Sequence, residues 1–217
     1  MGFDFPPPST ADEHGRVVTG GDLEPETLLR AYRRSLFPMR ISTGELTWFS
    51  PEPRGILPPE RLKVSDSLRR SRKRFEIRVD TAFEQVIAAC GAVHKEEYDW
   101  ITDEVQEAYV RLHLLGHAHS VEAWRHGELV GGLYGVAIGG LFAGESMFHR
   151  QADASKAALI GLVELMHEGR GERLLDIQWL TPHLASLGAI EIPRAEYLER
   201  LERVLALPLP SAFAGTR

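Results

Sequence analysis

Apolar residues fall into three short runs between Ser120 and Met147, and turn residues separate them. The runs cover residues 120–124, 129–138 and 141–147, with His126-Gly127 and Gly139-Gly140 in the gaps. Short apolar runs joined by tight glycine turns are typical of neighbouring antiparallel strands. The pattern therefore predicts a three-stranded antiparallel meander.

Helical patterns lie on both sides of this meander. Ser65 and Thr102 each precede one and are suitable N-caps, while Gly116 is a suitable C-terminal cap. Helices are expected over residues 25–35, from 65, and over 82–90, 102–116, 154–168, 183–187 and 194–205, with strands over 75–79 and 173–179. The order helix, meander, helix, strand, helix predicts an α+β, acetyltransferase-like (GNAT-type) domain.

Three parts are expected along the chain. Residues 1–18 are polar and proline-rich without a helical or strand period, which predicts a loose N-terminal tail. Residues 19–60 are expected to form a small N-terminal domain, of which residues 39–60, rich in proline, glycine and aromatic side chains, lack regular structure. Residues 61–217 then form the acetyltransferase-like domain.

Cysteine content and hydropathy narrow the cellular setting. Cys90 is the only cysteine in 217 residues, so an intramolecular disulfide is excluded and a reducing compartment is favoured. No apolar run approaches the roughly 20 residues that span a bilayer. We therefore expect a cytoplasmic protein with no membrane partner. Because no long exposed apolar heptad or edge strand is evident, we also expect a monomer.

Charge is distributed unevenly along this acidic chain. The formal net charge is −6, yet residues 61–78 carry eight Lys or Arg side chains and only two acidic ones. Arg69, Arg70, Lys73 and Arg74 share much of one helical face, a spacing suited to a phosphate backbone, and Arg72 lies between them. A plain solvated helix face is the alternative interpretation.

Three polar side chains interrupt apolar strands. Glu145 lies in an otherwise apolar strand and needs a cationic partner, either an arginine of the protein or a cationic substrate. Asp176 and Gln178 are two residues apart on a predicted strand and therefore share one face. A solvated strand edge or a polar site in a cleft would explain this pair. In the second case, we expect Asp176 to accept a hydrogen bond from the Gln178 side-chain NH₂.

Two kinds of cofactor are disfavoured. Acetyltransferase-type domains hold the pyrophosphate of coenzyme A at a glycine-rich turn, but residues 149–155 contain no glycine and place Asp153 there. No metal site is expected at His113, His117 and His119, because Gly116 would end the helix between the first two. A coenzyme A-dependent small-molecule N-acetyltransferase and a non-catalytic tRNA-binding module, which the basic face would suit, remain open at this point.

Motifs spread over most of the chain resemble one family, the leucyl/phenylalanyl-tRNA–protein transferases. The matching stretches are Gly20-Gly21-Asp22-Leu23, Ala31-Tyr32-Arg33-Arg34, Phe37-Pro38, Trp48-Phe49-Ser50-Pro51-Glu52-Pro53-Arg54, Trp100-Ile101-Thr102, Leu115-Gly116-His117-Ala118-His119-Ser120, Gly131-Gly132-Leu133-Tyr134-Gly135-Val136, Gly144-Glu145-Ser146-Met147-Phe148, Asp176-Ile177-Gln178 and His183-Leu184-Ala185-Ser186-Leu187-Gly188-Ala189.

This resemblance implies transfer of Leu or Phe from aminoacyl-tRNA to proteins that begin with Arg or Lys, without a cofactor, as an entry to the bacterial N-degron route of protein degradation. It leaves the ranking of Leu, Phe and Met donors open. The resemblance further implies a role for each of several residues: Asp176 and Gln178 as the catalytic pair, Glu145 facing the acceptor side chain, Leu133, Phe142, Met147 and Leu175 lining the aminoacyl pocket, and Trp100 contacting the tRNA 3′ end.

The chain departs from the family pattern at three places. Met39 stands where some members have Trp, and Phe49 replaces the second Trp of a Trp-Trp pair. Thr181-Pro182 replaces an Asn-Asp pair before His183. The first two departures concern how the 3′-adenosine stacks, whereas the catalytic pair is intact.

Overall fold

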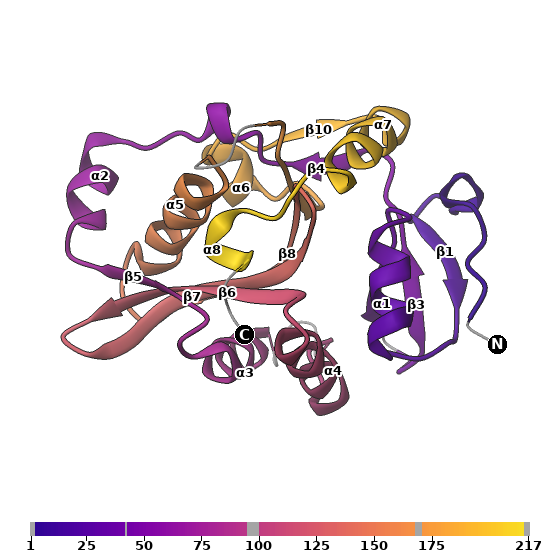
Figure 1. The fold of residues 1–217 in the computed structure, drawn as a ribbon, viewed down its shortest axis with the longest axis horizontal. Helices are drawn as coiled ribbons and strands as arrows, with labels where there is room; N and C mark the ends of the chain where they lie inside the picture. Colours follow the sequence, from indigo (N-terminus) through magenta and orange to yellow (C-terminus); the bar gives the residue numbers. More distant parts are fainter. Residues whose placement is uncertain (1–2, 42, 95–99, 168–170, 215–217) are drawn as a thin grey trace.

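A computed structural model describes residues 3–41, 43–94, 100–167 and 171–214, and two sheets organise them (Figure 1). The larger sheet has seven strands and the smaller has three. The strands of the larger sheet, in spatial order, are β10 (Ile190–Ile192), β4 (Arg54–Ile56), β9 (Leu174–Gln178), β8 (Leu141–His149), β7 (Glu128–Ile138), β6 (Ala118–Arg125) and β5 (Glu76–Val79). Strands β6, β7 and β8 are antiparallel neighbours, which confirms the predicted meander.

Helices cover both faces of the larger sheet. Helix α5 (Ala154–His167) packs on one face, and α3 (Phe83–His94) with α4 (Asp103–Leu114) on the other (Figure 1). The predicted N-cap of α4 is confirmed, because the Thr102 hydroxyl accepts a hydrogen bond from the Val105 N–H. The two larger of three buried apolar clusters lie on opposite faces of this sheet, and the third joins β4 and β9 to α7 (Arg194–Leu205). Outside these layers lie α7, α2 (Asp66–Arg72), α6 (Pro182–Ser186), α8 (Ser211–Ala214) and the short 3₁₀ turn η2 (Pro59–Arg61).

Strands β8 and β9 run parallel but pair along only part of their length. Their pairing extends from Leu141 opposite Leu174 to Ala143 opposite Asp176. Beyond this point β8 continues to His149 without β9 beside it, while remaining paired with β7. The side chains that follow Ala143 on β8 and Asp176 on β9 therefore lie where the sheet opens. This combination of an antiparallel meander with a diverging parallel pair confirms the α+β class expected from the sequence.

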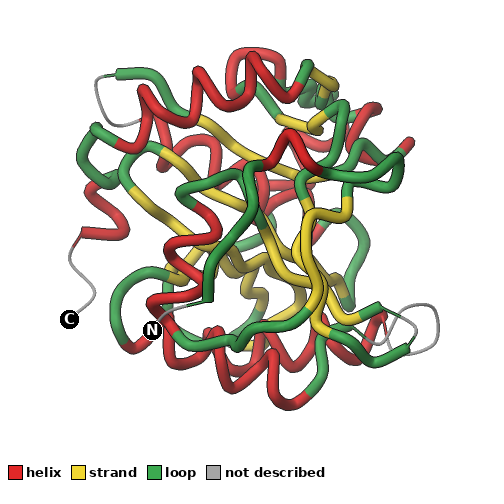
Figure 2. Tube along the Cα trace, turned by 90° about the vertical axis from the view of Figure 1, so that its right-hand side faces the viewer, coloured by secondary structure: helices red, strands yellow, loops and turns green. Residues whose placement is uncertain are grey.

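The N-terminal segment forms a second, smaller layer. Helix α1 (Pro25–Tyr32) lies beside a sheet in the order β1 (Arg16–Thr19), β3 (Leu46–Phe49), β2 (Phe37–Arg40), preceded by the 3₁₀ turn η1 (Pro8–Thr10). Figure 2 views the molecule from this side. Trp48 of β3, the middle strand of this smaller sheet, is fully buried and donates its indole N–H to the Gly20 carbonyl at 2.8 Å.

Two expectations about this region differ from the structure. Residues 3–18 are not a loose tail, because Phe5 is buried with its ring 4.8 Å from that of Trp48, and β1 pairs with β3. Residues 39–60 also contain regular structure, namely the end of β2 and all of β3 and β4. Proline in a sequence argues against a strand, so Pro38 made β2 hard to predict. The structure tolerates Pro38 because β2 is an edge strand.

The boundary between the two expected domains stays a prediction, although β4, within the span 19–60, belongs to the larger sheet. Among the described residues, no helix combines the length and apolarity needed to cross a membrane. Cys90 is fully buried, and burial raises the pKa of its thiol to about 12.

Candidate active site

A cavity of about 540 Å³ opens where β8 and β9 separate and where the smaller sheet meets the larger one. One part of its wall is apolar and carries leucines from four different elements: Leu133 of β7, Leu159 and Leu162 of α5, Leu175 of β9, and Leu184 of α6. Glu145 and Gln178 supply polar groups to the same cavity. Apolar lining with a few polar groups is the usual composition of a binding site for an organic substrate.

Asp176 does not line this cavity, although its neighbours Leu175 and Ile177 do, and both of its carboxylate oxygens are occupied. Oδ1 accepts from the Arg54 Nε at 2.8 Å and from the Gln178 backbone N–H at 3.0 Å. Oδ2 accepts from the Arg54 Nη2 at 2.6 Å and from the Tyr197 hydroxyl at 2.9 Å. Asp176 is only 1% exposed. A buried carboxylate with four donors is firmly fixed in position.

Arg54, the partner of Asp176, was given no role from the sequence. Its guanidinium is buried between the rings of Phe37, 4.8 Å away, and Tyr197, 4.6 Å away. Burial lowers the pKa of Arg54, but the Asp176 carboxylate outweighs burial, so the pKa lies above its ordinary value. Nη1 donates to the Ser35 carbonyl at 3.1 Å. One guanidinium therefore contacts both the N-terminal segment and the strand that carries the candidate catalytic pair.

Gln178 has a left-handed backbone with φ 60°, which is uncommon for a residue with a side chain. Its side-chain Nε2 is buried and has no hydrogen-bond partner among the described residues. The predicted hydrogen bond from this NH₂ to Asp176 is therefore wrong. The backbone N–H of Gln178 contacts Asp176 instead, because Arg54 and Tyr197 already surround the carboxylate.

Glu145 interacts with two buried tyrosines. Its carboxylate accepts from the Tyr32 hydroxyl at 2.6 Å and from the Tyr109 hydroxyl at 3.2 Å. Burial raises the pKa of Glu145 to about 7, and the charge of Asp176 adds to this, although the tyrosine hydrogen bonds act in the opposite direction. No Lys or Arg forms an ion pair with Glu145 among the described residues, so the expected arginine partner is not in contact with it; the charge of Arg54 lowers the pKa of Glu145 only from a greater distance.

The residues expected in the aminoacyl pocket do not all reach the cavity. Leu133, Met147 and Leu175 line it, whereas Phe142 does not. Phe142 lies opposite Leu175 in the paired part of β8 and β9, 1% exposed, with its ring 5.6 Å from that of Phe213. Closed sheet on one side and the C-terminal segment on the other keep Phe142 in the core.

The expected tRNA-contacting residues occupy two distant places. Trp100 lines the cavity and is 9% exposed. The basic residues lie on and just after α2, at the end of the molecule opposite the smaller sheet (Figure 1). Arg69, Arg70, Lys73 and Arg74 are exposed, and Arg72 forms an ion pair with Glu164 of α5 at 3.1 Å. A ligand that used both places would have to extend across the molecule.

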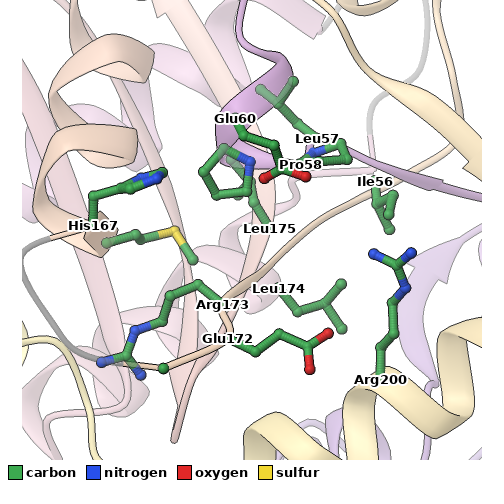
Figure 3. Close-up of a pocket in the computed structure, with 13 residues that line it drawn as sticks. Ile56, Leu57, Pro58, Glu60, His167, Glu172, Arg173, Leu174, Leu175 and Arg200 are labelled. Atoms are coloured by element: carbon green, nitrogen blue, oxygen red, sulfur yellow. The ribbon is translucent and has the colours of Figure 1, made fainter.

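A second cavity, of about 230 Å³, lies behind this site between β4, β9, α5 and α7. Figure 3 shows His167 of α5 and Arg200 of α7 on opposite sides of it. Two of its charged groups are paired within the protein: Arg200 bonds to Glu196 at 2.7 Å, and Glu172 forms an ion pair with Arg203.

Two family models match the chain. Residues 56–202 match "Leucyl/phenylalanyl-tRNA protein transferase", and residues 21–52 match its N-terminal domain. The leucyl/phenylalanyl-tRNA–protein transferase of Magnetococcus marinus is 47% identical, with 98% of this chain and 93% of the relative covered. The protein of the same name from Shigella dysenteriae is 50% identical, with 96% and 90% covered. A solved structure, the DUF2156 C-terminal domain of a protein from Agrobacterium fabrum, aligns with a TM-score of 0.40 at 13% identity, covering 85% of this chain and 59% of that one.

Proposed function

Because the chain belongs to the leucyl/phenylalanyl-tRNA–protein transferase family, enzymes that move an aminoacyl group from tRNA to a protein, we propose that it transfers Leu or Phe to proteins beginning with Arg or Lys. We place it in the bacterial cytoplasm, as a monomer that marks proteins for the N-degron route of degradation. The reaction needs no cofactor, because an aminoacyl ester is already activated toward an amine.

The position of Glu145 carries this proposal. Its carboxylate is half-buried beside Tyr32 and Tyr109 with no cationic partner among the described residues, and it lines the same cavity as Gln178. A desolvated carboxylate without a counterion is well matched to a cationic ligand. An N-terminal Arg or Lys carries its cation on the same residue as the attacking α-amine. The acceptor's side chain would therefore pair with Glu145 while its α-amine approaches Gln178.

The apolar part of the cavity supports a Leu or Phe donor. Leu133, Met147 and Leu175 line it, and α5 adds Leu159 and Leu162. Burying an apolar side chain contributes about 1.5–3 kcal/mol relative to leaving it in water. A branched or aromatic aminoacyl side chain would gain this energy, whereas a charged one would lose its hydration there. The exposed basic residues of α2 would hold the tRNA body through its phosphates.

Chemically, the site favours positioning over proton abstraction. The α-amine, with a pKa of about 8, is partly neutral at pH 7 and attacks the ester carbonyl carbon. The bond from that carbon to the ribose oxygen then breaks, and the ribose oxygen takes up the proton that the amine loses. Gln178 would accept a hydrogen bond from the amine through its side-chain oxygen. Asp176, held by Arg54, acts as a positioning residue that fixes the Gln178 backbone.

A transfer assay tests this proposal. Labelled Phe-tRNA is incubated with the enzyme and a peptide beginning with Arg, and the label is followed into peptide with and without ribonuclease. We expect label on the Arg peptide, less on a matched peptide beginning with citrulline, and none after ribonuclease. Absence of label on the Arg peptide would reject the proposal. Acetyl transfer from acetyl-CoA would favour the acetyltransferase, and tRNA binding without transfer would favour the non-catalytic module.

A further inference from the structure

Trp179 has an unusual position for a residue that follows a buried strand. In a regular strand, successive side chains point to opposite faces. Here Ile177, Gln178 and Trp179 all line the one cavity. The left-handed backbone at Gln178, with φ 60°, interrupts the alternation between them. Such a conformation costs on the order of 1–3 kcal/mol and persists only where its surroundings impose it.

The surroundings that impose this backbone are visible in the contacts of β4 and β9. The Gln178 N–H is held by the Asp176 carboxylate. On the other side, Gly55 of β4 passes so close that a Cβ there would lie 3.0 Å from the Leu180 nitrogen and from the Trp179 carbonyl carbon. Glycine at position 55 therefore makes room for the turn. The turn brings the Trp179 indole to the same cavity as Gln178.

The Trp179 indole packs against two aromatic rings and is nevertheless partly exposed to solvent. Its ring meets those of Phe37, 5.0 Å away, and Phe49, 5.6 Å away, in edge-to-face geometry. Even so, 39% of Trp179 is exposed. The other exposed large apolar side chains among the described residues are Val93, Leu114 and Leu115, and they lie away from the cavity. An aromatic ring held by two neighbouring rings and partly exposed at a cavity is suited to stacking against another flat ring.

We infer that Trp179 is the stacking surface for the terminal adenine of the donor tRNA, an inference that rests on the proposed function. In aminoacyl-tRNA, the ester and the adenine are attached to the same ribose. When the ester carbonyl lies at Gln178, the base must lie within one nucleoside of it. Trp179 is the next residue in the chain and lines the same cavity with a partly exposed ring. Trp100, only 9% exposed, has less surface to offer.

The test compares two donors that differ only in the base: the phenylalanyl ester of adenosine and the phenylalanyl ester of a ribose without a base. The quantity measured is the ratio of their kcat/KM values with an Arg-initiated peptide. Base–aromatic stacking of about 1–3 kcal/mol corresponds to about 5- to 150-fold. We expect W179L to lower the ratio by that factor, W179F to retain most of it, and L115A, a change at an exposed leucine away from the cavity, to retain all of it.

The outcomes separate the inference from the function on which it rests. An equal loss on both donors in W179L would make Trp179 a structural contact between the two sheets, and an unaltered ratio would also overturn the inference. If W179L fails to fold, adenosine should quench the fluorescence of wild type but not of W179F, and equal quenching would overturn it. If wild type transfers from neither ester nor from charged tRNA, the proposed function itself fails.

Discussion

The selectivity for a cationic acceptor should change with pH as the Glu145 carboxyl ionises. The substitution E145Q keeps the shape of the side chain but removes the charge, and its NH₂ donates to one tyrosine where Glu145 accepts from it. In wild type, burial raises the pKa of Glu145 to about 7. At pH 6 about one-tenth of the molecules would carry the carboxylate, and at pH 8 about nine-tenths. Binding of Arg should therefore strengthen as the pH rises across this interval.

The magnitude follows from the loss of a desolvated charge pair. Removing one partner of such a pair costs about 2–5 kcal/mol, which corresponds to a selectivity change of about 30-fold or more. The assay measures the ratio of kcat/KM for a peptide beginning with Arg to that for its neutral isostere citrulline. Titration of the α-amine affects both peptides alike and cancels in the ratio. The pH dependence that remains in the ratio reports the ionisation of the group that recognises the cation in the free enzyme.

In wild type, this ratio should rise about ninefold between pH 6 and pH 8, in parallel with the ionised fraction. In E145Q it should be low and independent of pH. A second readout has the opposite sign: a raised carboxyl pKa gives stability that is present below about pH 4.5 and is lost as the pH rises through about 7. E145Q should remove that loss. A wild-type ratio that is flat between pH 6 and pH 8, or a high ratio in E145Q, would refute the reasoning.

Three further predictions concern other parts of the molecule. Asp176→Asn should destabilise the fold by about 3–5 kcal/mol in denaturant titrations, because it leaves a buried guanidinium without its counterion; a loss below about 1 kcal/mol would contradict this. Replacing both Arg70 and Lys73 by Ala should shallow the dependence of log tRNA affinity on log salt by about two units, whereas Arg72→Ala, the matched control within an ion pair, should have a smaller effect; an unaltered slope in the double variant would place the RNA elsewhere. Native Cys90 should resist thiol reagents at pH 8, where burial keeps it protonated, and modification as fast as in the unfolded chain would show that the site opens.

Local features of the fold could be predicted from the sequence. The meander follows from apolar runs and glycine turns, and the N-caps at Ser65 and Thr102 both accept the expected backbone N–H. The short strands β2 and β3 could not be predicted in this way. Their stability comes from pairing with each other and from the burial of Trp48, which are contacts beyond the local sequence. The ordered start of the chain was missed for the same reason.

In the candidate site too, some residues could be predicted from the local sequence and others could not. Glu145 and Gln178 attract notice because a polar residue in an apolar strand is unusual. Arg54 and Tyr197 do not, although they hold Asp176, because each lies far from it in sequence and only the sheet order brings them together. The left-handed backbone of Gln178 has no sequence signal either, since glutamine is not a residue type that favours it.

The guanidinium shared by Ser35 and Asp176 has a consequence for how such a protein can evolve. Arg54 is the first residue of β4 in the larger sheet, but its guanidinium also contacts Ser35 and Phe37 of the N-terminal segment. A gene fusion that replaced everything before Arg54 would remove the Ser35 carbonyl and the Phe37 ring from around a buried cation. Recombination immediately before Arg54 should therefore be disfavoured, and the N-terminal segment and the larger sheet should be inherited together rather than exchanged as modules.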